Sequence, residues 1–191
     1  AAALARVAPP SRQVPKERVR GPFVILPLIA VSGMVSFVYE VLWVRLLGYV
    51  LGGSTAAFAT MLASFLMGIA LGSAVASRIA KNPSSASLGF AVMQIAAAIF
   101  AIISFSLAGF LPEWSRALAA SPSNLLPGAL LSVVILLPVT TCIGATFPFA
   151  VRILAVDADD AASASARVYA WNTLGSIVGS VGAGFLLLPL L

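Results

Sequence analysis

Long uncharged stretches alternate with short charged clusters along the whole chain. The uncharged stretches cover residues 21–39, 46–77, 82–112, 117–151 and 168–191. Each of them holds about the 20 mostly apolar residues that a helix needs to cross a bilayer. The pattern therefore predicts five membrane-spanning helices, over residues 22–50, 55–79, 87–111, 125–150 and 168–190.

The uncharged stretches favour helices over strands, since they are apolar on every face. Membrane strands alternate polar and apolar residues over about ten positions, whereas residues 90–110 show no such alternation. The expected fold class is all-α, a polytopic helical membrane bundle. The first predicted helix is about 45 Å long, against a hydrocarbon core of about 30 Å, so we expect it to tilt or bend.

Composition narrows the function classes. Hydrophobic residues make up 61% of the chain and charged residues 9%, whereas a soluble domain carries about 25% charged residues. This balance excludes an ordinary soluble enzyme and a disordered chain, and the sparse, localised basic residues argue against nucleic-acid binding. The chain has no His and one Cys, Cys142 in an apolar stretch. Zinc and haem sites would lack ligands, so we expect no metal and no cofactor.

The basic residues predict an orientation in the membrane. Five of the 11 Lys and Arg residues lie in residues 1–20, beside one acid and three prolines. We expect this segment to be a flexible cytoplasmic arm, followed by a membrane domain over residues 21–191. The second and fourth loops then raise the cytoplasmic count to nine of 11, as the positive-inside rule requires. The expected location is the bacterial inner membrane, with Leu191 on the outer side and further chain beyond it.

Glu40 and Arg45 are the charged residues embedded within a predicted span. They are five residues apart and point about 140° from each other on a helix, so they cannot pair as i,i+4 residues do. One interpretation is an interfacial Glu and Arg beside an aromatic belt of Tyr39, Trp43 and Tyr49. The alternatives are a structural ion pair with another helix and a proton or substrate site.

Small residues recur four positions apart on two predicted helices. The pairs are Gly68 with Gly72 and Gly175 with Gly179. This spacing lets helix backbones approach closely. It predicts tight helix packing and carries no information about a ligand.

The remaining polar residues at membrane depth are candidates for contacts between helices or with a solute. They are Gln94, Thr140, Thr141, Thr146, Asn172 and Thr173. Hydrogen bonds between helices account for most such residues. Pro138 and Pro148 can bend the fourth helix, or open its backbone to a substrate as in transporters with broken helices.

Three carboxylates precede the fifth predicted helix, at Asp157, Asp159 and Asp160. They are able to bind a cation or a polyamine. A solvated loop that caps the helix is the simpler interpretation.

Three blocks of the chain resemble, in the same order, the membrane domain of bacterial spermidine synthase-like proteins, which are described as fused major-facilitator and spermidine synthase proteins. The blocks are GMVSFVYEVLWVRLLGYVLGGSTAAFATMLASFLMGIALGS (33–73), GATFPFAVRI (144–153) and RVYAWNTLGSIVGSVGAGFLLLPLL (167–191). The resemblance covers residues 22–191 and implies a bundle like half of a major-facilitator protein. The positions that it carries over as family candidates are Tyr39, Glu40, Arg45, Pro148 and Asn172.

In the resembled family, the membrane part precedes a Rossmann-like aminopropyltransferase domain. That domain binds decarboxylated S-adenosylmethionine at a loop rich in glycine and acid. The present sequence has no such loop and no matching catalytic Asp. No catalytic residue is carried over, and we expect this chain not to be an enzyme.

Three functions remain open. The leading one is a non-catalytic membrane domain that anchors a soluble C-terminal domain or packs against other membrane subunits. The second is an accessory subunit of a large respiratory or photosynthetic complex. The third is half of a transporter for a polyamine or another small solute, with a cavity lined by Glu40, Gln94, Thr141 and Asn172.

Overall fold

The computed structural model describes residues 24–118 and 126–190. The predicted cytoplasmic arm over residues 1–20 lies outside the described residues. All the regular secondary structure in the described ranges is helical. The all-α class predicted from the sequence is thereby confirmed.

Five of the helices are long and apolar enough to cross a membrane, as the uncharged stretches predicted. The helices are α1 (Ile25–Leu51), α2 (Thr55–Ile79), α3 (Pro83–Leu107), α4 (Leu111–Leu118), α5 (Leu126–Leu154) and α6 (Ala161–Gly182). A 3₁₀ turn, η1 (Ala108–Phe110), joins α3 to α4, and α6 continues through the π-helical η2 (Ala183–Leu187) and the 3₁₀ turn η3 (Leu188–Leu190). The short helix α4 was not predicted.

Local capping explains where several helices start and stop. The Ser54 side chain accepts a hydrogen bond from the Ala57 amide at the start of α2 (3.1 Å). Asn82 does the same for α3, and Pro83 occupies the first turn, so α3 begins four residues before the predicted position. Gly52 ends α1 with a left-handed φ of 86°, which glycine adopts at no steric cost.

The last long helix starts earlier than the sequence pattern indicated. α6 begins at Ala161 rather than at residue 168. Its first residues are alternating Ala and Ser, which are polar enough to resemble a loop. Alanine is nevertheless the best helix former, so the helix extends back to the acidic loop.

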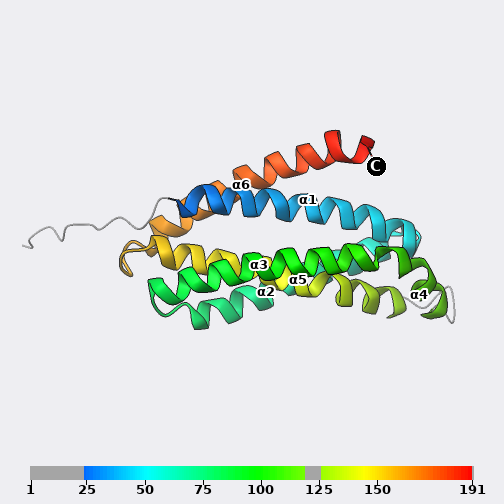
Figure 1. Cartoon of the computed structure of the whole chain (residues 1–191), viewed down its shortest axis with the longest axis horizontal. Helices are drawn as coiled ribbons and strands as arrows, with labels where there is room; N and C mark the ends of the chain where they lie inside the picture. Colours follow the sequence, from blue (N-terminus) through cyan, green and yellow to red (C-terminus); the bar gives the residue numbers. More distant parts are fainter. Residues whose placement is uncertain (1–23, 119–125, 191) are drawn as a thin grey trace, which may run out of the picture.

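α5 lies at the centre of the bundle, between α2 and α3. In the apolar segment of α5, about 56% of the residues are buried, compared with 11% in the apolar segment of the span that contains α3. α1 pairs mainly with α6 on the other side of the molecule, as Figure 1 shows. The fold therefore consists of an α1–α6 pair packed against a layer of α2, α5 and α3.

The α2–α5 seam is built on small residues. A Cβ added at Gly72 would collide with the backbone carbonyl of Thr141, and one at Gly68 would collide with the side chain of Thr140. On α5, Gly144 lies against the backbone of Ile69 in the same way. Any larger side chain would force the two backbones apart.

The α1–α6 seam uses the same device. A Cβ at Gly175 would meet the carbonyl of Ala30, and one at Gly179 would meet the carbonyl of Met34. Gly33 on α1 lies against Asn172 on α6 in return. The fold thus contains two pairs of helices whose backbones are in close contact.

Candidate functional site

A cavity of about 300 Å³ lies where the α1–α6 pair meets α2 and α5. All four helices contribute side chains to its lining. The polar side chains, apart from Tyr169, are Ser36, Glu40, Ser73, Thr146, Asn172 and Ser176. The cavity therefore lies between the two seams, with a largely apolar lining that includes several polar side chains.

Glu40 is the charged residue of this lining. It is half-buried and lies two residues from the middle of α1. Among the described residues it has no ion pair and no side-chain hydrogen bond, and the one ion pair found there joins Asp160 and Arg167. A carboxylate in this position is a candidate for binding or proton chemistry.

The hydroxyl groups of the lining are mostly engaged with the backbone. Ser73 donates to the Gly144 carbonyl (2.8 Å), and Thr146 donates to the Ile143 carbonyl. Ser176 donates to the carbonyl of Asn172 (2.9 Å). Each of these groups has one proton, so what remains for a ligand is its acceptor capacity.

Two of the four residues predicted for a solute cavity, Glu40 and Asn172, line this one. Gln94 and Thr141 do not. Gln94 borders a separate cavity of about 210 Å³ between α1, α3 and α5, where it accepts a hydrogen bond from Ser32 (3.3 Å). Thr141 lies in the α2–α5 seam, since its backbone carbonyl faces Gly72.

The Arg45 side chain is exposed and lies apart from the Glu40 cavity. Its guanidinium carbon is 5.5 Å from the centroid of the Tyr49 ring, which is also exposed. This geometry fits a cation–π contact at the surface of the bundle. Arg45 is therefore not a counter-ion for Glu40.

The aromatic-belt interpretation is wrong for Tyr39 and Trp43. Their exposed fractions are 4% and 1%, so neither can face a membrane interface. Both rings pack on Phe105 of α3, with centroids 5.9 and 5.1 Å away. Sequence spacing alone could not reveal which face of α1 would meet α3.

Sequence reasoning missed a row of buried polar atoms on α1. The Ser36 hydroxyl and the Trp43 indole N–H are buried and have no hydrogen-bond partner among the described residues. Ser36 lines both the Glu40 cavity and the Gln94 cavity. The sequence did carry a signal for this row. Ser36, Tyr39 and Trp43 are three and four residues apart, which places their side chains on one face of the helix.

The prolines and the cysteine have structural positions. α5 remains helical from Leu126 to Leu154 across both Pro138 and Pro148. It therefore does not show the broken helix that a transporter-like interpretation of these prolines required. Cys142 is buried, in agreement with its interpretation as a small hydrophobic residue.

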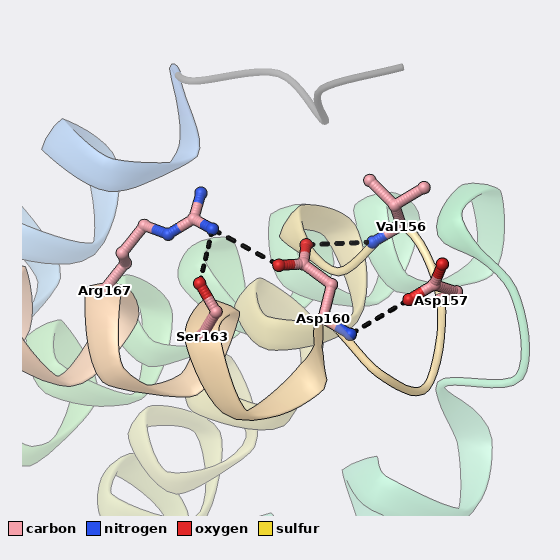
Figure 2. Close-up of polar contacts among 5 residues, drawn as sticks. All are labelled: Val156, Asp157, Asp160, Ser163 and Arg167. Carbon is pink, nitrogen blue, oxygen red and sulfur yellow. Dashed lines mark hydrogen bonds and ion pairs between the residues drawn. The ribbon is translucent and has the colours of Figure 1, made fainter. Parts of the chain in front are cut away.

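The acidic loop before α6 forms a local network (Figure 2). Asp157 accepts a hydrogen bond from the Asp160 amide (2.9 Å), and Asp160 pairs with Arg167 (3.3 Å). Asp160 also accepts from the Val156 amide (3.4 Å), and Arg167 donates to Ser163 (2.6 Å). These contacts tie the loop to the first turns of α6 and engage the carboxylates of Asp157 and Asp160.

Helix capping at this loop differs from the expectation. Asp160 holds the cap position of α6 but makes no side-chain capping hydrogen bond. No group of three potential metal ligands occurs in the described ranges, this loop included. Because Asp157 and Asp160 are already engaged in local contacts, the loop is a weaker candidate for cation binding than the Glu40 cavity.

Comparison with known proteins gives one distant relationship. No family model and no solved structure matches the chain. The chain is similar to polyamine aminopropyltransferase 2 of Streptomyces coelicolor, with 27% identity over 176 residues. The match covers 90% of this chain and 30% of that protein, so the chain spans under a third of the length of this relative. The comparison links this helical bundle, at a distance, to a spermidine synthase-like protein.

Proposed function

We propose that the chain is the non-catalytic membrane domain of a spermidine synthase-like protein. In this role it anchors the protein in the bacterial inner membrane and packs against other membrane helices. The observation that carries the proposal is the match of 90% of a five-span bundle to an aminopropyltransferase. Large apolar side chains exposed along α3 and α6 supply the surface for lipid or for partner helices.

The chemistry of the bundle also supports a non-catalytic role. Aminopropyl transfer requires a site that holds decarboxylated S-adenosylmethionine, and the resembled family builds that site from a glycine- and acid-rich loop. The acids in the described residues are Glu40, Glu113, Asp157, Asp159 and Asp160. None of them lies in such a loop.

Membrane fractionation and reporter fusions test the proposal. The chain, expressed in a bacterium, should stay in the membrane after extraction with alkaline carbonate. Alkaline phosphatase fused after Leu191 should be active and green fluorescent protein fused there should be dark, with the reverse at residue 1. Extraction of the chain, or aminopropyl transfer from decarboxylated S-adenosylmethionine by the chain alone, would refute the proposal.

A second candidate is half of a transporter for a polyamine or another small solute. One observation favours it, namely that Glu40 and Asn172 line the same cavity. Uptake of radiolabelled putrescine by cells that express the chain tests this function. A Glu40→Gln variant should lose that uptake, and equal uptake by the variant and the wild type would exclude the role.

A further inference from the structure

We propose that the cavity beside Glu40 binds a primary alkylammonium group, with the Glu40 carboxylate as its counter-ion. The inference goes beyond an anchoring role, and it requires no transport. It rests on the charge, the hydrogen-bonding polarity and the shape of the lining.

The charge of the cavity is that of one carboxylate. Glu40 is the acid in the lining, and no Lys or Arg side chain contributes to it. Taking an unpaired carboxylate away from water costs free energy, which a bound cation would offset. A single positive charge neutralises the site.

The hydrogen-bonding polarity favours a ligand that donates. The hydroxyls of Ser73, Thr146 and Ser176 already donate to backbone carbonyls, so they can offer a ligand acceptor lone pairs only. The Ser36 hydroxyl, which is buried without a partner among the described residues, and the Asn172 side-chain amide can each accept from a ligand as well as donate to it. An ammonium group carries three donors and no acceptor, which complements this lining.

Aromatic rings favour an organic cation over a metal ion. Phe37, Phe65, Phe147 and Tyr169 all line the cavity. Their faces attract ammonium groups and their edges pack against an alkyl chain. A metal ion would need several oxygen ligands of its own, and the described part of the chain has no cluster of three acidic, His or Cys side chains.

The size of the cavity fits one alkylammonium group with a short chain. Its volume of about 300 Å³ lies at the small end of ligand pockets. Tyr169 is 65% exposed, so the cavity reaches the outer surface of the bundle there. A longer amine would enter with one ammonium group at Glu40 and leave its other end outside, because the lining has no second acid.

Binding of n-butylammonium to the purified chain tests the proposal. Equilibrium dialysis of radiolabelled n-butylamine near neutral pH, in a nonionic detergent, should show saturable binding to the wild type. Glu40→Gln keeps the shape and removes the charge, so it should bind at least about tenfold more weakly. Glu113→Gln, at an exposed acid of α4, is the matched control and should bind like the wild type.

Two further measurements separate the ammonium site from its rivals. Tyr169→Leu should bind about twofold to fivefold more weakly, because it removes one aromatic face. Sodium ions at the same concentration should not displace the amine. Displacement by sodium would assign the cavity to a metal cation and overturn the proposal.

Folding controls keep the test decisive. Glu40→Gln should elute with the wild type on size exclusion and remain in the membrane fraction, so a fault in the anchoring role would be seen separately. Glu40→Asp, which keeps the charge, should retain more affinity than Glu40→Gln. Absence of saturable binding to the wild type, or equal binding by Glu40→Gln, would show that no such site exists.

Discussion

The packing within each helix pair differs sharply from the packing between the pairs. In the α2–α5 and α1–α6 seams, glycines such as Gly72 and Gly175 bring one backbone onto another. Between the pairs, phenylalanines and polar side chains meet around Glu40 and leave a cavity of about 300 Å³. Seams of this kind leave no room for a ligand, whereas the looser interface contains a cavity large enough for a small one.

The two kinds of interface have different roles in the bundle: the seams hold helices together, and the interface between the pairs contains the cavity. In a bilayer, close van der Waals packing and hydrogen bonds hold helices together, since lipid is as apolar as leucine. The glycine seams supply that packing and define two closely packed helix pairs. The interface between them has less close packing, so it can hold the one embedded carboxylate of the described spans.

Breaking a seam should have the largest effect on stability. Alanine at Gly72 or at Gly175 places a Cβ against a backbone carbonyl, so the helices must separate. We expect each variant to lower the free energy of unfolding by about 1–3 kcal/mol. Unfolding in sodium dodecyl sulfate, followed by circular dichroism, measures the change.

The same substitution at open positions is the control for the seam variants. Gly48 on α1 and Gly182 on α6 have no atom within 4 Å of an added Cβ. Alanine there should leave stability unchanged or raise it by up to about 1 kcal/mol, because alanine favours helix over glycine. Equal losses at open and packed positions would show that the seams do not depend on close approach.

At the cavity, we expect a substitution to raise the free energy of unfolding instead of lowering it. Glu40→Gln removes an unpaired, half-buried carboxylate, so the variant should be more stable than the ligand-free wild type by about 1–2 kcal/mol. Adding n-butylammonium should raise the stability of the wild type toward that of the variant. A less stable Glu40→Gln variant would mean that the carboxylate has a partner that stabilises the fold.

Two buried serines allow the same comparison of cavity and packed positions, with smaller expected changes in the free energy of unfolding. Ser36→Ala removes a buried hydroxyl that has no partner, so we expect a gain of about 1 kcal/mol. Ser132 is also buried but donates to the Gly128 carbonyl (2.8 Å). Ser132→Ala should therefore lose about 0.5 kcal/mol in the same unfolding assay. Opposite signs for the two serines would support the cavity as a site short of hydrogen-bond partners.

The sequence predicted the spans well because charge is so costly in a bilayer. Charge-free gaps alone located five helices, and residues 55–79 coincide with the bounds of α2. Helix ends were harder, since caps such as Asn82 and alanine-rich turns such as the start of α6 act over a few residues. The short helix α4 was missed because it follows α3 at the end of the third span and carries charged residues that break the apolar pattern.

The candidate site was only half visible in the sequence. An embedded Glu40 stands out by its charge, and Asn172 stands out by its polarity. Which polar residues share a cavity depends on how the helices pair. Gln94, on α3, borders a different cavity, between α1, α3 and α5. Burial of Tyr39 and Trp43 likewise depends on α3 packing over them, which no local pattern specifies.

The smallest effect is expected where a carboxylate is already satisfied. Asp160 is paired with Arg167, whose side chain is 40% exposed, so solvent screens the interaction. Arg167→Gln should lower the free energy of unfolding by less than about 1 kcal/mol, and the loss should shrink further in 1 M salt. It should leave n-butylammonium binding unchanged, since Arg167 does not line the Glu40 cavity. A large loss of binding in this variant would place the cation site at the acidic loop, and the contrast between a satisfied and an unsatisfied carboxylate would no longer identify the functional one.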